Sequence, residues 1–214
     1  RLIPTTPQQM SDTACILCYF MPPTIGITAD HQKDKHVLSE AYSAAVREAG
    51  GIPVILPPVI GLESAFLSMC DGFVFSGGDD PIMEHWGIPT HPNATPVSSE
   101  RQQFELTLLA GLQEKPAVPV LGICLGMQLL FERSEEGNCD GLGFIKGEVV
   151  RFNFSNIETK LRIPHIGWNF VDIKKESALV ENMFSENKFY FVHSYHARCE
   201  EKDYILMTTQ YNYN

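Results

Sequence analysis

A cysteine at position 124 stands between two glycines, in the run Leu121-Gly122-Ile123-Cys124-Leu125-Gly126-Met127-Gln128. A continuous apolar run precedes it and a helical pattern follows it, so Cys124 lies at a predicted strand-to-helix turn. This is the pattern of a nucleophile elbow, in which a sharp turn exposes the reactive side chain and small neighbours let the turn close. The helix N-terminus favours a thiolate, and the Leu125 backbone N–H lies where it can hold an oxyanion. We therefore predict that Cys124 is a nucleophile rather than a small buried hydrophobic residue.

A second glycine-containing turn, Ser76-Gly77-Gly78-Asp79, follows the apolar run Phe73-Val74-Phe75. Adjacent glycines allow a ligand to approach the backbone closely. Taken alone, this segment is equally well read as an ordinary tight turn. Because ligands of open α/β folds bind at the carboxyl ends of the strands, we predict that an N–H of this turn completes the oxyanion hole.

The elements that must position these turns alternate between strand and helix up to residue 133. Helical spacing joins Val37, Tyr42, Ala45, Val46 and Ala49 and stops at Gly50-Gly51. The predicted strands are 24–28, 52–56, 73–75 and 118–123, and the predicted helices are 37–49, 62–69, 99–112 with Ser99 as its cap, and 125–131. Such alternation predicts a parallel sheet covered by helices on both faces. Later residues change character, with short strands predicted within 143–173 and at 189–192 and 204–209.

The length, composition and charge of the chain exclude several classes of protein. The chain has 214 residues, 44% of them apolar, and a formal net charge of −10, which suits one well-cored domain and excludes disorder over most of its length. The acidic balance argues against nucleic acid or an anionic membrane as the main partner. The longest N-terminal apolar run, Ala14–Met21, is too short to span a bilayer and makes a poor signal peptide, so we expect a cytoplasmic protein.

Other chemistry-bearing residues favour structural roles. Cys15 and Cys18 form a C-x-x-C pair without the second pair of a zinc site, and Asp79-Asp80 lacks accompanying ligands, so we expect no metal and no cofactor. Glu135-Glu136 reads as a solvated face. Trp168 and the aromatic residues around 189–195 could form a partner interface, but core packing is the favoured interpretation.

The run Gly122–Gln128 strongly resembles the nucleophile motif of class I, triad-type glutamine amidotransferases and related γ-glutamyl hydrolases. The segments 24–28, 44–57, 75–81 and 100–106 resemble the γ-glutamyl-γ-aminobutyrate hydrolase family, which is peptidase C26-like. The segments 131–137, 141–143, 163–169 and 189–195 resemble the glutaminase subunit of imidazole glycerol phosphate synthase. Both resemblances imply one fold, a flavodoxin-like, open and mostly parallel α/β sheet with helices on both faces.

The resemblance also implies roles for individual residues. Cys124 would attack the γ-amide of glutamine, or another γ-glutamyl amide, and pass through a thioester. Gly78 and Leu125 would supply the oxyanion hole, and the implied substrate-binding residues are Gly77, Gly126, Gln128, His193, Ser194 and Tyr195. The favoured function is a glutaminase that supplies ammonia to a synthase partner. The alternatives are a self-sufficient γ-glutamyl amine hydrolase and a binding protein or fragment that lacks part of the triad.

The sequence departs from both families at the end of the triad. They complete it with the His and Glu of a late His-Pro-Glu motif, whereas here the one His-Pro pair is His91-Pro92. The motif would fall shortly beyond 208–211, so we expect a C-terminal strand and helix to be missing from a domain spanning 21–214. We also expect 1–20 to be a non-native or disordered leader, with Met21 as the natural start. His165, His193 and His196 remain as substitute bases, although a lining role is favoured.

Overall fold

The computed structural model describes residues 21–87, 89, 90, 92, 94–155, 161–181, 183 and 187–211. The expected leader, with Cys15 and Cys18, lies outside these residues, as does His91. The chain divides into two compact units. One contains the residues up to Ser76 together with Ser98–Leu121, and the other contains Gly77–Val97 and Gly122–Asn214. A single domain over 21–214 therefore stays a prediction.

The first unit is built on a four-stranded sheet in the order β4-β1-β5-β6. Its strands are β1 (Thr24–Thr28), β4 (Ile52–Leu56), β5 (Gly72–Phe75) and β6 (Val120–Gly122). β1 pairs in parallel with both β4 and β5. Counted along the chain, these strands follow the order 2-1-3-4 of flavodoxin-like folds. The predicted parallel sheet is therefore confirmed, and its apolar strand β5 is buried throughout.

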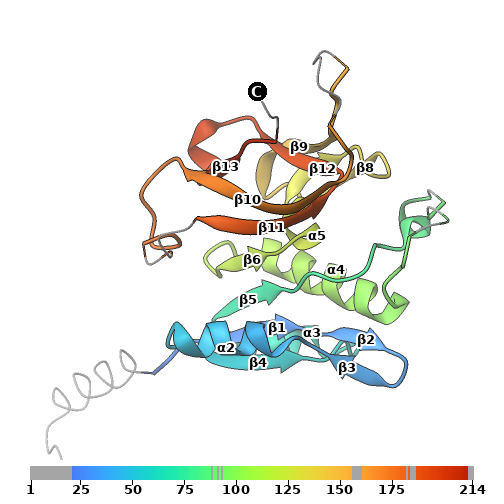
Figure 1. The fold of residues 1–214 in the computed structure, drawn as a ribbon. Coiled ribbons are helices and arrows are strands. Elements are labelled where there is room, and N and C mark those ends of the chain that lie inside the picture. Colours follow the sequence, from blue (N-terminus) through green and yellow to red (C-terminus); the bar gives the residue numbers. More distant parts are fainter. Residues whose placement is uncertain are drawn as a thin grey trace, which may run out of the picture. The chain divides into compact units, whose positions relative to one another are not determined.

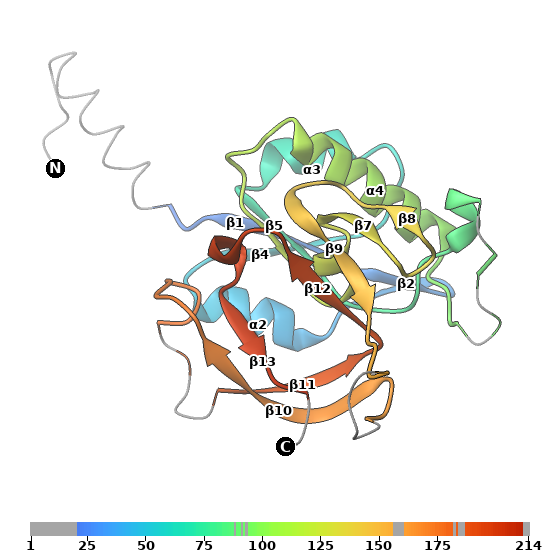
Figure 2. The ribbon, with the colours of Figure 1, turned by 90° about the horizontal axis from the view of Figure 1, so that it is seen from above.

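Helices cover both faces of this sheet, as predicted. Figure 2 shows α2 (Glu40–Glu48) on one side of β1 and β4, with α3 (Glu63–Met69) and α4 (Ser99–Gln113) on the other. Helices α3 and α4 pack closely. A Cβ added to Gly111 of α4 would lie only 2.4 Å from Leu67 Cδ1 of α3. Phe66 and Phe104 meet edge to face at 5.9 Å. The predicted apolar face of α4 is buried through Phe104, Leu108, Leu109 and Leu112.

Three boundaries in this unit differ from the sequence prediction. Val37 is not helical, because it ends the hairpin of β2 (Asp30–Gln32) and β3 (Lys35–Val37). The cap of α4 is Ser98 rather than Ser99, since Ser98 Oγ accepts the Arg101 backbone N–H at 3.1 Å. The strand predicted over 118–123 is shorter, because Val118 N–H bonds back to Lys115 in a turn and Ile123 C=O accepts from Gly126 in the next one.

The second unit consists of short, mainly antiparallel strands (Figure 1). One sheet has the order β12-β9-β7-β8 and another has the order β11-β10-β13. Its strands are β7 (Phe131–Ser134), β8 (Cys139–Asp140), β9 (Ile145–Arg151), β10 (His165–Ile173), β11 (Lys188–His193), β12 (Tyr195–Cys199) and β13 (Met207–Thr209). The unit also holds α5 (Leu125–Gln128) and the 3₁₀ turns η1 (Met83–Trp86) and η2 (Lys202–Tyr204). The predicted change of character after residue 133 is confirmed.

The helix predicted over 125–131 was too long. It ends at Gln128, and Phe131 begins strand β7 opposite Ile145. Two carbonyls just after the helix are taken by distant N–H groups, Leu142 N bonding Leu129 O and Ile145 N bonding Leu130 O. These tertiary hydrogen bonds satisfy groups that a longer helix would otherwise use. No helix in the described part of the chain combines the length and apolar character needed to cross a bilayer.

Histidines and aromatic rings form a packed cluster in the second unit. His165 is 3% exposed and stacks between Phe191 and Tyr211. Its Nδ1 lies 3.0 Å from His193 Nε2, and His193 Nδ1 lies 2.8 Å from the Tyr195 carbonyl. Because that carbonyl can only accept, His193 carries its proton on Nδ1 and accepts from His165. Burial lowers the pKa of both histidines, so the cluster favours neutral rings.

Replacing Phe104 by Ala tests the helix-to-sheet core. Phe104 is fully buried, and its loss should lower the free energy of unfolding by about 3–5 kcal/mol. Chemical denaturation followed by circular dichroism measures this. The matched control is Gln103→Ala on the exposed side of the same helix, which should stay within about 0.5 kcal/mol of the parent. Equal effects of the two substitutions would contradict the assignment of the core.

The histidine cluster predicts a pH dependence of stability. Because the folded-state pKa values of His165 and His193 lie below the ordinary 6.5, the unfolded chain binds more protons as the pH falls through that value. The free energy of unfolding should therefore decrease from about pH 6.5 downward. In His165→Phe, the stacking remains but one titrating ring is gone, so this decrease should be smaller. Denaturation midpoints at pH 8, 6.5 and 5 give the test, and an unchanged slope would contradict it.

Candidate active site

Cys124 has the backbone conformation of a nucleophile elbow. Its φ is +57° and its ψ is −122°, a region that residues with a side chain rarely occupy. The turn is held by two backbone hydrogen bonds, from Gly126 N to Ile123 O and from Met127 N to Cys124 O, both 3.1 Å. The side chain is exposed. The elbow predicted from the glycine spacing is therefore present in the fold.

Gly122 is the residue that lets this turn close. A Cβ at this position would lie 2.5 Å from the carbonyl carbon and oxygen of Gly126 and 2.6 Å from Met127 N. All three are backbone atoms, which cannot move aside as the end of a side chain can. The strand before Cys124 and the helix after it approach each other here as closely as a glycine permits. The glycine spacing thus has a steric cause.

The two predicted oxyanion donors follow neighbouring strands. Leu125 is the first residue of α5, where a backbone N–H has no acceptor within the helix. Gly78 is exposed and follows β5, which lies next to β6 in the sheet. The oxyanion roles of Gly78 and Leu125 stay predictions.

Two of the predicted substrate-binding residues, Gln128 and His193, line separate cavities, one on each side of α5. Leu125 and Gln128, three positions apart, share one cavity, while Met127 faces the other. The cavity beside Gln128 is lined by Pro81, Met83, Trp86, Leu125, Gln128, Leu129, Ser134, Glu136, Cys139, Asp140 and Gly141. His193 lines the opposite cavity, of about 770 Å³, together with Met127, Phe152 and His196. The binding roles of Gly77, Gly126 and Gln128 stay predictions.

Glu136 was missed as a site residue by the sequence analysis, which placed it on a solvated face. It lines the cavity beside Gln128, and burial together with the nearby Asp80 carboxylate raises the pKa of its carboxyl. Its neighbour Glu135 is exposed and accepts the Arg151 backbone N–H at 2.8 Å. Both residues lie in the turn after β7, and they differ in exposure although they are adjacent in the chain. The sequence alone does not indicate which of two adjacent glutamates is exposed and which lines a cavity.

His193 is committed to the histidine cluster. Both ring nitrogens have partners, one in His165 and one in the Tyr195 carbonyl. The Ser194 carbonyl accepts the Phe152 N–H at 3.1 Å, so the carbonyls of Ser194 and Tyr195 each already have a donor. Each retains a second lone pair for a ligand. His196 stacks on Phe152 at 4.9 Å and points its Nδ1 toward the Ala197 carbonyl at 3.2 Å. The structure favours the lining role of these histidines over the role of substitute base.

Trp168 is 65% exposed, so the favoured prediction of core packing was wrong for this residue. It faces Tyr190 across the β10–β11 pair, and the two rings meet edge to face at 5.6 Å. Alternation in the two strands places five exposed apolar side chains on this same sheet face: Ile166, Trp168, Phe170, Tyr190 and Val192. We call this set the aromatic face. A continuous exposed apolar face of this kind is typical of an interaction surface.

Asp80 has a structural role. Its Oδ2 accepts the Thr95 N–H at 2.9 Å, and its own N–H bonds the Thr95 carbonyl at 2.8 Å. Among the described residues, no group of three or more His, Cys, Asp or Glu side chains could hold a metal ion. The described cysteines, Cys70, Cys124, Cys139 and Cys199, are free thiols.

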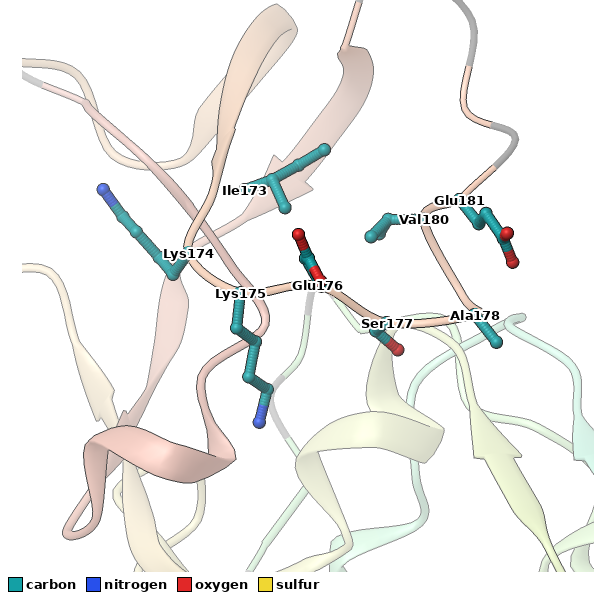
Figure 3. A pocket seen from close by; sticks show the side chains of 8 residues that line it. All are labelled: Ile173, Lys174, Lys175, Glu176, Ser177, Ala178, Val180 and Glu181. Carbon is teal, nitrogen blue, oxygen red and sulfur yellow. The ribbon is translucent and has the colours of Figure 1, made fainter.

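A further pocket lies along residues 173–181, far along the chain from the elbow (Figure 3). Figure 3 shows the Lys174 and Lys175 amines pointing away from each other. Lys174 pairs with Asp172 at 3.7 Å, and Lys175 contacts the Asp203 carbonyl. These polar groups do not converge on a common point, so the pocket does not compete with the elbow as an active site.

The curated proteins similar to this chain include subunits of imidazole glycerol phosphate synthase. The chain is 52% identical over 100 residues to imidazole glycerol phosphate synthase subunit HisH 2 of Methanococcus maripaludis, a match covering 47% of each protein. It is 50% identical over 105 residues to subunit HisH of Pyrococcus furiosus, covering 49% of this chain and 50% of that one. The chain thus spans about half the length of the curated relatives it matches.

A solved structure shares the fold. It is a putative GMP synthase subunit from Thermoplasma acidophilum, with a TM-score of 0.53 and 18% identity. The match covers 88% of this chain and 74% of that one. At this identity the likeness concerns the fold alone, and it agrees with the flavodoxin-like strand order of the central sheet.

The family comparison covers far more of the chain than the curated relatives do. The family model described as Peptidase C26 matches residues 23–203, from the start of the first strand, through the elbow, to the second 3₁₀ turn. With the resemblance carried by residues 122–128, this match shows that the chain belongs to the Peptidase C26 family, within the class I glutamine amidotransferase superfamily.

Proposed function

We propose that this chain is a glutaminase of the amidotransferase type, with Cys124 as its nucleophile. The observation that carries the proposal is the positive-φ elbow at Cys124, closed by the backbone contact between Gly122 and Gly126. Such strain persists only where surrounding structure enforces it, and it clusters at catalytic positions. It presents the sulfur at the end of strand β6, beside the first N–H of α5, which has no acceptor within the helix.

The proposed reaction is an acyl transfer in two steps. The Cys124 thiolate attacks the γ-carbonyl carbon of glutamine, and the Leu125 and Gly78 N–H groups hold the oxyanion that forms. The C–N bond then breaks, its nitrogen takes up a proton and leaves as ammonia, and a γ-glutamyl thioester remains. Water hydrolyses the thioester, which releases glutamate and restores the thiol. Gln128 contacts the substrate in this proposal, and Ser194 and Tyr195 hold its amino-acid end.

We propose that the ammonia passes to a synthase partner. The curated relatives are named as subunits of imidazole glycerol phosphate synthase, which supports a partner of the synthase kind. The aromatic face supplies a surface suited to such a partner, since Trp168 and Tyr190 are exposed there as large anchors. The free thiols of the described cysteines support a reducing compartment, and we place the activity in the cytoplasm.

One specific observation favours a second function, a self-sufficient γ-glutamyl amine hydrolase. The Peptidase C26 model matches residues 23–203, whereas the synthase-subunit relatives match about half of the chain. Both functions use the same elbow and the same thioester. They differ in the leaving amine, so parallel assays with glutamine and with γ-glutamyl amines separate them. Thioester formation without turnover would identify the catalytically incomplete alternative.

Covalent labelling tests the nucleophile. A diazoketone analogue of glutamine should label Cys124, as located by peptide mass spectrometry, and added glutamine should slow the labelling. Cys124→Ser should abolish it, while Cys139→Ser, which changes a neighbouring free thiol, should leave it unchanged. Glutamate release is measured in parallel to distinguish labelling from turnover. Labelling spread over several cysteines, or absent from Cys124, would refute the catalytic proposal.

Gly122→Ala tests the geometry of the elbow. Its Cβ would meet the Gly126 backbone at 2.5 Å, so the turn must open and the Cys124 labelling rate should fall by about 100-fold. The matched control is Gly50→Ala, which has a φ of +86° and open space around its Cβ. That control should lose about 1 kcal/mol of stability but label at the parent rate. Similar labelling rates for both variants would mean that the strained turn is not required.

A further inference from the structure

Ser194 joins two different sheets of the second unit. It follows β11, which pairs with β10, and it precedes β12, which pairs with β9. The chain bends at this residue, and the Ser194 carbonyl accepts the Phe152 N–H at 3.1 Å. In the proposed function, Ser194 and Tyr195 hold the amino-acid end of the substrate. The bend sets the direction of their backbone groups, so whatever fixes the bend also controls that part of the site.

The pairing of β12 with β9 leaves the backbone groups of Tyr195 pointing away from β9. Two hydrogen bonds fix the register, from Phe152 N to Ser194 O and from Glu200 N to Lys146 O. Hydrogen-bonded positions alternate with non-bonded ones in an antiparallel pair, so Tyr195 occupies a non-bonded position. β12 is also the outermost strand of its sheet. The N–H and C=O of Tyr195 therefore face the edge of the sheet.

The His193 side chain holds the Tyr195 carbonyl in place of a neighbouring strand. Its Nδ1–H donates to that carbonyl at 2.8 Å. The hydrogen bond closes a ring that contains the two peptides on either side of Ser194. Local hydrogen bonds of this kind, from a side chain to the backbone two residues on, restrict the backbone angles that the ring encloses. The conformation of the bend thus depends on a proton at His193 Nδ1.

His165 keeps that proton on Nδ1. The two histidines lie opposite each other in the β10–β11 pair, and His165 Nδ1 is 3.0 Å from His193 Nε2. The nitrogen of a neutral imidazole that carries the proton is set by the hydrogen bond that the other nitrogen makes. Because His193 Nε2 accepts from His165, the proton of His193 stays on Nδ1. Without His165, Nε2 could take the proton, and a bare Nδ1 would face the lone pairs of the Tyr195 carbonyl.

The surroundings of His165 make it a rigid anchor for this hydrogen bond. Its ring is 3% exposed and stacks on Phe191 at 4.8 Å and on Tyr211 at 3.8 Å between ring centroids. The ring cannot turn without breaking these contacts, and burial protects its hydrogen bond from competing water. His193 is only half-buried, so its orientation depends more on its hydrogen-bond partners.

We propose that His165 is a positioning residue for substrate binding, acting through His193 on the bend at Ser194 and Tyr195. This inference rests on the proposed function, in which these two residues hold the amino-acid end of the substrate. The role requires no contact of His165 with the substrate or with the Cys124 sulfur. It concerns how tightly the amino-acid end is held and not the reactivity of the thiol.

Two diazoketones test this role, because they share a reacting group but only one has an amino-acid end. They are the diazoketone analogue of glutamine and ethyl diazomethyl ketone, which lacks the α-amino and carboxylate groups. The parent chain should label at Cys124 faster with the glutamine analogue. His165→Phe keeps the ring stacking but has no donor, so labelling by the glutamine analogue should slow by about 5- to 10-fold. Labelling by ethyl diazomethyl ketone should stay at the parent rate.

Two further variants serve as a rescue and a matched control. His165→Asn places an amide nitrogen as many bonds from Cβ as the Nδ1 of histidine, so it can donate to His193 and should recover most of the preference for the glutamine analogue. His36→Phe makes the same change as His165→Phe at an exposed histidine of the first unit, and should leave both labelling rates unchanged.

The outcomes separate this inference from the proposed function. If neither diazoketone labels Cys124 in the parent chain, the proposed function fails and the inference fails with it. If the parent prefers the glutamine analogue and His165→Phe keeps that preference, or slows with both reagents equally, only the positioning role is overturned. Should His165→Phe not fold, His193→Phe removes the donor to Tyr195 at a half-buried position. Selective slowing with the glutamine analogue in that variant supports the role, and an unchanged preference overturns it.

Discussion

The structure around the candidate active site depends on one close contact, the approach of the Gly122 and Gly126 backbones on either side of Cys124. A sharp reversal there requires Cys124 to adopt a positive φ, and no residue larger than glycine fits at position 122. The parallel sheet supplies the strand that ends at this contact, and the helices on its two faces hold the strand in place. The strained cysteine is a consequence of the fold and not of its own preference.

Polar interactions, rather than a steric contact, hold the end of the neighbouring strand β5. There the buried charge of Arg101 contacts the carbonyl of Ser76 and the carboxylates of Asp30 and Glu105. Buried ionic groups cost free energy to desolvate, and a network of this kind is retained where it specifies one conformation.

The family match and the curated relatives describe the chain in complementary ways. The Peptidase C26 model accounts for residues 23–203, while the synthase-subunit relatives share higher identity with about half of the chain. The aromatic face adds a property that an isolated hydrolase does not need, because exposed Trp and Tyr side chains cost solubility unless a partner covers them. This exposure supports the proposed dependence of the glutaminase on a partner.

Local patterns in the sequence were sufficient to predict the parallel sheet, its helices and the cysteine elbow. Continuous apolar runs and closely spaced glycines determine these features, and each pattern spans only a few residues. Tertiary contacts decided the rest. The helix after Cys124 ends at Gln128 because N–H groups of Leu142 and Ile145 take the carbonyls that follow. Trp168 is exposed and Arg101 buried, against the usual preference of each residue type, because exposure depends on which faces the sheets and helices cover. The commitment of His193 to His165 likewise joins residues on two different strands, and no local spacing encodes such a pairing.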